Sequence, residues 1–357
     1  MIDPQRIADA QSLLARYFEP TRIARAASLS RAGHDVFLKI ETSLPTGSFK
    51  VRGAIYALSV NLAARGGLQT APPGAIVEVV CASTGNHGAA VAYAAQRLGV
   101  AATIFLPDNP NQVKAARIRD LGARIVEGGV DLSAAIDAAR DYATRTAAFF
   151  LHDASDPDVP AGAATIGLEI VDQQPAVDVI YVPMGDTALI RGVASAAKQR
   201  RRSVRVVGVV AERAPAYLLS WQRSRATTGA DAVQAFRPAG TADVQVRTIS
   251  DDAVVETATC ETIADGLAIR RPLAHNVAEI RELVDEVVAV SEQEMIAAID
   301  LLYRQEQVIA EPAGAAATAG LLKSARRART SVVLVTGGNI APGLRPKEST
   351  ERTEGTD

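Results

Sequence analysis

Short apolar runs rich in β-branched residues alternate in this chain with longer alanine-rich stretches of helical period. Strands that are apolar on both sides, separated by helices, are typical of a parallel sheet covered on both faces. The pattern predicts strands at 36–40, 76–81, 102–106, 123–126, 148–151, 179–182, 204–210, 286–290 and 332–335. It predicts helices near 50–64, 87–98, 110–121, 131–145, 159–173, 187–201, 291–305 and 312–324. We therefore expect an α/β protein with mostly parallel, twisted sheets and helices on both faces.

The length and the charge balance narrow the class of protein further. At roughly 150 residues per domain, 357 residues suggest about two domains. Lysine and arginine number 38 and the acids 40, a net charge of −2 without a long basic stripe, so we expect no nucleic-acid partner. No apolar run reaches the roughly 18 residues of a membrane span, and the first residues lack the basic-then-apolar order of a signal peptide. We expect a cytoplasmic protein without a membrane partner.

Cysteines and polar segments add two further expectations. Cys81 and Cys260 have neither a CxxC spacing nor a histidine at ligand spacing, so we expect no disulfide framework and no structural zinc. Residues 227–249 are polar and read as a surface excursion. Residues 345–357 lack any apolar face and are predicted to be a disordered tail.

The segment LPTGSFKVRGA, residues 44–54, places Lys50 in the first turn of a predicted helix. The partial positive charge of a helix N-terminus disfavours a cation and so lowers the pKa of an amine there. A lysine that forms a Schiff base needs such a lowered pKa, so this placement fits covalent catalysis. Taken alone, a lysine that simply points to solvent explains this single residue better.

The segment CASTGNHGAAVAYAAQRLG, residues 81–99, joins a strand to a long helix through small polar residues. Backbone N–H groups at a helix N-terminus bind anions, so a carboxylate or a phosphate would fit there. An ordinary helix start, with Gly85 in a left-handed turn, explains the same residues about equally well.

Together these segments resemble the motifs of fold-type II pyridoxal phosphate (PLP) enzymes, in the branch of threonine and serine dehydratases and serine racemase. The resemblance continues through TIADGLAIRRP (262–272), VVAVSEQEMIAAIDLL (287–302), EPAGAAATAG (311–320) and VTGGN (335–339), and covers about residues 20–343. It implies a smaller α/β domain at 53–150 and a larger PLP-binding domain formed by 1–52 and 151–344. It also implies PLP as the cofactor, a small amino acid as the substrate, and a homodimer.

The resemblance assigns roles to single residues. Lys50 would hold the cofactor as a Schiff base and then move the α-proton, while Phe49 would pack near the cofactor ring. Asn86 would hydrogen-bond the ring hydroxyl. Thr336 would face the ring nitrogen with a neutral hydroxyl, which lets that nitrogen stay unprotonated and favours loss of a β-leaving group. The substrate's α-carboxylate would be held by Ser83, Thr84, Asn86 and His87.

Glu311 resembles the family's acidic residue near the cofactor. As a glutamate directly before Pro312, it fits the start of a helix at least as well. Both roles, an acid near the cofactor and a residue at a helix start, stay open for Glu311.

The phosphate-binding loop departs from the family pattern, in which it is nearly all glycine. Here the stretch VPMGDTALIRG, residues 182–192, has Asp186, Thr187 and Ala188 where glycines are expected. We expect Asp186 to turn away and cap the next helix, while Thr187 and the backbone from Gly185 to Leu189 hold the phosphate. Weaker cofactor binding or a different substrate is the alternative, because Asp186 brings negative charge toward a dianion.

A cation site of the family also has little support in this sequence. Glu212, within VGVVAERAPAYLLSW, is the only plausible carboxylate there. One carboxylate is too few for a hard divalent ion, so we expect no metal, or a monovalent cation held by backbone carbonyls.

The resemblance therefore predicts a PLP-dependent lyase that converts a β-hydroxy α-amino acid of the threonine or serine type to a 2-oxo acid and ammonia. Three alternatives stay open: an amino-acid racemase, a dehydratase of an unusual hydroxy amino acid (hydroxyectoine-related or aryl-substituted), and a catalytically weak paralogue that binds PLP. Racemisation ranks below elimination, because the methyl group of Thr84 would crowd the ring face where a second acid or base must act.

Overall fold

A computed structural model describes residues 1–66, 77–83, 85–110, 112–225, 246–248, 254–324 and 328–346. The described residues do not include Thr84. They also leave out most of the predicted excursion at 227–249 and most of the predicted tail at 345–357. Among the described helices, none is both long enough and apolar enough to cross a membrane.

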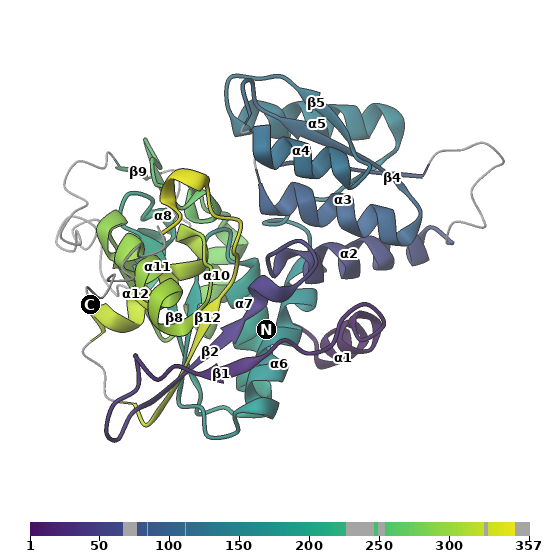
Figure 1. The fold of residues 1–357 in the computed structure, drawn as a ribbon. Helices are drawn as coiled ribbons and strands as arrows, with labels where there is room; N and C mark the ends of the chain where they lie inside the picture. Colours follow the sequence, from purple (N-terminus) through teal and green to yellow (C-terminus); the bar gives the residue numbers. More distant parts are fainter. Residues whose placement is uncertain are drawn as a thin grey trace, which may run out of the picture.

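Two mostly parallel sheets organise the chain (Figure 1). The larger has the strand order β1 (Ile23–Arg25), β2 (Asp35–Ile40), β12 (Thr330–Val335), β7 (Val179–Pro183), β8 (Arg205–Ala211) and β11 (Glu286–Val290). The smaller has the order β5 (Arg124–Glu127), β4 (Ala101–Leu106), β3 (Glu78–Ala82) and β6 (Phe149–Phe150). Within these two sheets only the pair β1 and β2 is antiparallel. The α/β class and the nine predicted strands are confirmed.

Eight predicted helices are also present: α2 (Lys50–Ala64), α3 (Asn86–Leu98), α4 (Gln112–Asp120), α5 (Leu132–Thr146), α6 (Val159–Gln173), α7 (Ala188–Arg200), α11 (Glu292–Glu306) and α12 (Pro312–Lys323). Four further elements were not predicted: α1 (Pro4–Leu14), α8 (Ala216–Arg225), α10 (Ala274–Leu283) and β1. A two-stranded antiparallel pair, β9 (Val246–Thr248) and β10 (Val255–Thr257), was not predicted either. Helix α1 carries a readable start, because Asp3 caps it and Pro4 follows.

The helices pack closely because their contact faces consist of small residues. Helix α12 is buried along most of its length, with alanines and glycines against the larger sheet. Helix α6 crosses α2 so closely that a Cβ atom on Gly162 would lie 2.5 Å from the backbone oxygen of Arg52. This contact holds the start of α2, and therefore Lys50, against α6.

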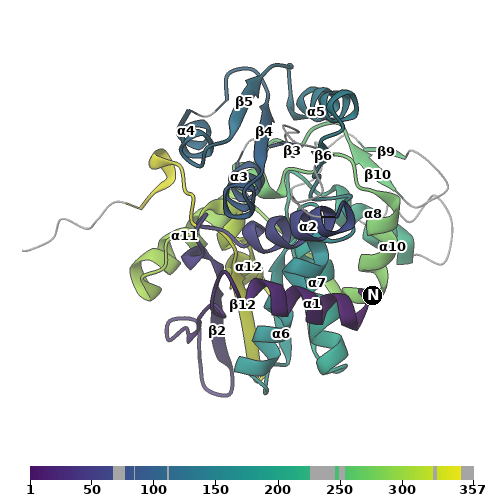
Figure 2. The ribbon, with the colours of Figure 1, turned by 90° about the vertical axis from the view of Figure 1, so that its right-hand side faces the viewer.

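The four-stranded sheet and helices α3, α4 and α5 form one group, and the six-stranded sheet with its helices forms the other, with α2 between them (Figures 1 and 2). The smaller sheet takes its strands from residues 78–150, and the larger takes them from 23–40 and 179–335. The domain bounds at 52/53 and 150/151 stay a prediction. Ligands of open parallel sheets bind at the carboxyl ends of the strands, and these ends of both sheets face the cavity described next.

Candidate active site

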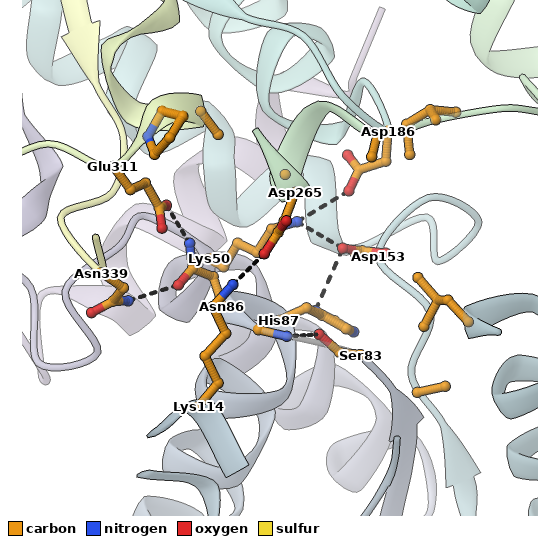
Figure 3. A pocket seen from close by; sticks show the side chains of 18 of the residues that line it. Lys50, Ser83, Asn86, His87, Lys114, Asp153, Asp186, Asp265, Glu311 and Asn339 are labelled. Atoms are coloured by element: carbon orange, nitrogen blue, oxygen red, sulfur yellow. Dashed lines mark hydrogen bonds and ion pairs between the residues drawn. The ribbon is translucent and has the colours of Figure 1, made fainter. Parts of the chain in front are cut away.

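A cavity of about 340 Å³ lies where the two groups of elements meet. Its polar lining comes from the start of α2, the segments after β3 and β6, the turn after β7, the start of α12 and the turn after β12 (Figure 3). The polar residues central to the site are Lys50, Asn86, Asp153, Asp186, Glu311 and Asn339. Segments far apart in the sequence therefore supply one site.

Lys50 is the first residue of α2, as predicted, and its position is tied to the last strand of the larger sheet. The backbone N–H of Phe49 donates to the carbonyl of Thr336 at 3.0 Å, and Gly338 N–H donates to the carbonyl of Gly47 at 2.9 Å. Gly47 has φ +67°, a conformation that favours glycine. The TGSFK and TGGN motifs are thus one hydrogen-bonded unit that places Lys50 beside Thr336.

The amino group of Lys50 lies between two carboxylates. Its Nζ is 2.7 Å from Asp153 Oδ2 and 3.1 Å from Asp186 Oδ2. Burial by itself would lower the pKa of Lys50, but the charges of Asp153 and Asp186 outweigh burial and raise it. The prediction that the helix N-terminus lowers this pKa is therefore wrong, because two carboxylates in direct contact exceed the effect of a helix dipole.

The segment after β3 contributes Ser83, Asn86 and His87 to the cavity. Ser83 Oγ accepts from the N–H of Gly85 at 3.1 Å, and α3 begins at the next residue. Gly85 has φ −165°, which is extended backbone, so the left-handed turn considered for it is absent. Ser83 and the first turn of α3 provide the small polar groups that an anion-binding role requires.

His87 is buried and is held by the backbone. Its Nε2 lies 3.2 Å from the carbonyl oxygen of Leu151, and because a carbonyl can only accept, Nε2 carries a hydrogen. Its Nδ1 lies 3.8 Å from Asp153 Oδ2. His87 therefore connects the start of α3 to the segment that carries Asp153.

Both the nitrogen and the oxygen of the Asn86 side-chain amide form hydrogen bonds. Its Nδ2 donates to Glu311 Oε1, and its Oδ1 accepts from Asn339 Nδ2 at 2.7 Å. The Oδ1 of Asn339 in turn accepts from Arg117, on α4. Burial raises the pKa of the Glu311 carboxyl, while the hydrogen bond from Asn86 lowers it. Glu311 immediately precedes α12 without capping it through its side chain, and it lines the cavity, so a role near the cofactor stays a prediction.

The turn between β7 and α7 is compact and carries Asp186. A Cβ atom on Gly185 would overlap the carbonyl oxygen of Gly266, and Thr187 adopts a left-handed φ of +74°. Asp186 Oδ1 accepts from the N–H of Ala188 at 2.9 Å, so the predicted capping interaction is present. The prediction that Asp186 turns away is wrong, because its Oδ2 contacts Lys50 within the cavity.

The cofactor that the sequence motifs imply needs an amine for its aldehyde and donors for its phosphate. A narrower part of the site is lined by Phe49, Lys50, Asn86, Gly185, Asp186, Thr187, Leu189 and Thr336. Thr187 Oγ1 is buried and has no hydrogen-bond partner in the described part of the chain, and the first turn of α7 offers backbone N–H groups. The Lys50 amine, which could react with the aldehyde, and the start of α7, which could bind the phosphate, thus line the same part of the site. The residues fit PLP, although Asp186 places a negative charge beside the expected phosphate.

The carboxylate considered for a cation site is paired with a lysine. Glu212 Oε1 lies 2.9 Å from Lys323 Nζ, which also lies 3.0 Å from Glu294 Oε2. Among the described residues, no three histidine, cysteine, aspartate or glutamate side chains are grouped so that they could hold a metal ion.

Five polar residues of the cavity were not predicted from the sequence: Lys114, His152, Asp153, Asp265 and Asn339. Lys114 and Asp265 form an ion pair between α4 and the short helix at Asp265–Leu267. Asp153 could have been predicted, because it follows a predicted strand and therefore lies at the same end of the sheet as Ser83. Asn339 lies within the quoted VTGGN motif, so its residue type was visible although its contact with Asn86 was not.

Comparison with known proteins shows the family of this chain. The model of the pyridoxal-phosphate dependent enzyme family matches residues 14–337. The chain is 36% identical over 345 residues to the L-threonine ammonia-lyase of Thermotoga maritima. The aligned region covers 95% of this chain and 76% of that protein. Among solved structures, a threonine deaminase from T.th. matches with a TM-score of 0.79 and 28% identity, covering 95% and 99% of the two chains. Maize serine racemase matches with a TM-score of 0.78 and 26% identity, covering 96% and 94%. The chain belongs to the pyridoxal-phosphate dependent enzymes.

Proposed function

We propose that this enzyme removes water from a β-hydroxy α-amino acid of the threonine or serine type and releases a 2-oxo acid and ammonia. The observation that carries the proposal is Lys50, whose amino group faces a cavity that also contains a helix start suited to a phosphate. The similarity to threonine ammonia-lyase, threonine deaminase and serine racemase supports the substrate class.

The proposed roles follow from where each group lies. The chemistry that bound PLP would supply is an aldehyde for the substrate's amino group and an electron sink that would make the α-hydrogen acidic. Lys50 Nζ is the base that accepts this proton. Ser83 and the first turn of α3 hold the substrate's carboxylate. Thr336 offers a neutral hydroxyl to the cofactor ring, Phe49 packs beside it, and Thr187 with the N–H groups of α7 holds the phosphate.

The overall reaction balances without an added reagent. The substrate loses its α-hydrogen and its β-hydroxyl as water, and one water is taken up again when the nitrogen leaves as ammonia. The β-carbon gains a proton in the process. The products are therefore the 2-oxo acid and ammonium, and water is neither gained nor lost overall.

A racemase is the second candidate, because maize serine racemase matches nearly the whole chain. Racemisation needs an acid or base on each face of the α-carbon, and Lys50 supplies one of them. The proposal ranks elimination first, because Thr84 is bulkier than the small residue expected of such a second acid or base.

The test is to incubate the purified holoenzyme with L-threonine, L-serine and D-serine, and to measure 2-oxo acid, ammonium and the enantiomer of the remaining amino acid. We expect equal amounts of 2-oxo acid and ammonium, and a loss of about 10²–10⁴-fold in Lys50→Ala. Lys323→Ala, at a lysine outside the cavity, is the matched control. Inversion without 2-oxo acid would establish the racemase instead, and an unchanged Lys50→Ala rate would refute the proposal.

The proposal extends to a homodimer in the cytoplasm. The family resemblance supports the dimer, and the free state of Cys81 and Cys260 fits a reducing compartment. Light scattering of the purified protein tests the first point, and fractionation of cells tests the second.

A further inference from the structure

The two carboxylates beside Lys50 come from different sheets. Asp153 follows β6 of the smaller sheet, and Asp186 follows β7 of the larger one, so Lys50 is held where the two groups of elements meet (Figure 3). Asp186 has a second task, since its other oxygen caps α7. Asp153 makes the shorter contact with Lys50 Nζ, at 2.7 Å, and it lies five residues before the cap of the next helix, α6. Its function is therefore best explained through Lys50.

The backbone on both sides of Asp153 is fixed. Leu151 is fully buried, and its N–H donates to the carbonyl of Val80 at 2.8 Å, which continues the pairing of β6 with β3. The carbonyl of Ala154 accepts from Nδ2 of the buried Asn276 at 3.1 Å. A side chain between two anchored neighbours is held in place before any ligand arrives, which is the condition for directing a catalytic group.

The charges around the pair determine its electrostatic state. Besides Asp153, the groups that face Lys50 are Asp186 from the start of α7 and Glu311 from the start of α12. His87 and His152 face Asp153, and burial lowers the pKa of His152. Burial raises the pKa of Asp153, but Lys50, His87, the hydrogen bond with Asp186 and His152 together outweigh burial and leave this pKa well below its usual range. Asp153 is thus an acceptor and not a proton donor while Lys50 is charged.

We propose that Asp153 is the positioning residue of Lys50: its carboxylate directs the amino group and stabilises the protonated form that arises when Lys50 accepts a proton. This inference rests on the proposed function, in which Lys50 is the base. Asp153 itself exchanges no proton. The N–H bond forms on Lys50, the electron pair of the broken C–H bond stays with the substrate, and Asp153 only balances the new positive charge. A base whose protonated form is stabilised in this way is stronger than a lysine without such a partner.

The first experiment measures Lys50 without measuring turnover. The full-length protein freed of cofactor is mixed with pyridoxal at a series of pH values. The Lys50 amine, after losing a proton to solvent, condenses with the aldehyde, so that a C=N bond forms and water leaves. Borohydride then reduces this bond, and mass spectrometry of the Lys50 peptide measures the extent. Pyridoxal is chosen because it lacks the phosphate, so repulsion between Asp186 and a phosphate group does not contribute to the result.

Asp153→Asn keeps the shape of the side chain and removes its charge. We expect the pH of half-maximal labelling to fall by at least about one unit, and labelling at a fixed lower pH to rise about tenfold. Asp265→Asn is the matched control, because Asp265 lines the same cavity but pairs with Lys114. Labelling in that variant should follow the wild type.

The second experiment separates positioning from a merely structural role through the pH profile of the holoenzyme. With a weaker base, the plateau of kcat in Asp153→Asn should be lower, while its acidic limb should move to lower pH. Damage to the fold would lower the plateau without moving the limb. Asp153→Glu restores a carboxylate and should return the limb toward the wild-type position.

The outcomes are distinct. If Lys50 is labelled in Asp153→Asn with the wild-type pH dependence, this inference is overturned while the proposed function stands. If Lys50 is labelled in none of the variants, the proposed function itself fails. If Asp153→Asn does not fold, Asp153→Ser replaces it, because it also removes the carboxylate 2.7 Å from Lys50. A lowered half-maximal pH in that variant supports control of Lys50 by Asp153, and an unchanged one overturns it.

Discussion

Arg52 Nε lies 2.8 Å from Glu41 Oε2, and both side chains are almost completely buried. The same guanidinium contacts Glu169, which also binds the buried Lys39. Arg52 stands two residues after Lys50, so this network joins the helix that carries Lys50 to β2 and α6. The charges balance within the network, which makes the loss of any one of them costly.

We expect Arg52→Met to lower the free energy of unfolding by about 3–5 kcal/mol, because it leaves buried carboxylates unpaired. Urea denaturation measures this quantity. Arg25→Ala breaks an exposed pair with Asp35 and should cost no more than about 1 kcal/mol. Equal losses in the two variants would mean that burial does not determine the strength of the network.

Removing the carboxylate of Asp186 should tighten cofactor binding. In Asp186→Gly the N–H of Ala188 becomes available, and a negative charge near the expected phosphate is lost. We expect the Kd for PLP to fall by at least about fivefold, about 1 kcal/mol, with a smaller change for pyridoxal. Equilibrium binding of both compounds measures the difference. Looser binding of PLP would show that Asp186 supports the cofactor.

Glu311 should make stability depend on pH. Burial raises its pKa above the usual 4.5, so the unfolded chain loses this proton first as pH rises. The folded state then binds more protons than the unfolded state, and stability falls as pH rises from about 4.5 through the folded pKa. We expect the gain in Tm from Glu311→Gln to be larger at pH 8 than at pH 5. Glu282→Gln, at an exposed position, is the matched control. A gain that is equal at both pH values would contradict this sign.

Gly185 should tolerate no side chain. In Gly185→Ala the new Cβ would overlap the backbone oxygen of Gly266, so the turn before α7 must shift. We expect a loss of about 1–3 kcal/mol in stability together with weaker PLP binding. Gly343→Ala, where no atom lies within 4 Å of the new Cβ, should leave both unchanged. Thermal unfolding and cofactor titration check the pair, and an unaffected Gly185→Ala would mean that the turn is not constrained by Gly266.

The alternation of apolar runs and helical stretches was enough to predict the sheets, because fully buried strands such as β7 and β12 have no polar face to obscure them. Helices α1 and α10 are short, and only one face of each is buried, so they stood outside the alternation of strands and helices that the pattern followed. The motifs placed Lys50 at a helix start. They could not indicate its charge state, because that depends on Asp153, which is 103 residues away in the sequence.

Asp186 illustrates the same limit within one motif. Its capping of α7 involves a neighbour two residues away and follows from local preference. Its contact with Lys50 involves a residue 136 positions away and depends on how the sheets are arranged. Local interactions were predictable from sequence, and long-range ones required the fold.

The central claim, that Lys50 is the residue that bonds to the cofactor, is tested most directly by borohydride reduction of the holoenzyme followed by peptide mass spectrometry. The account predicts a pyridoxyl group on the peptide that contains Lys50, and none on Lys39, Lys114 or Lys198. A reduced holoenzyme in which Lys50 is unmodified, or in which another lysine carries the group, would contradict it.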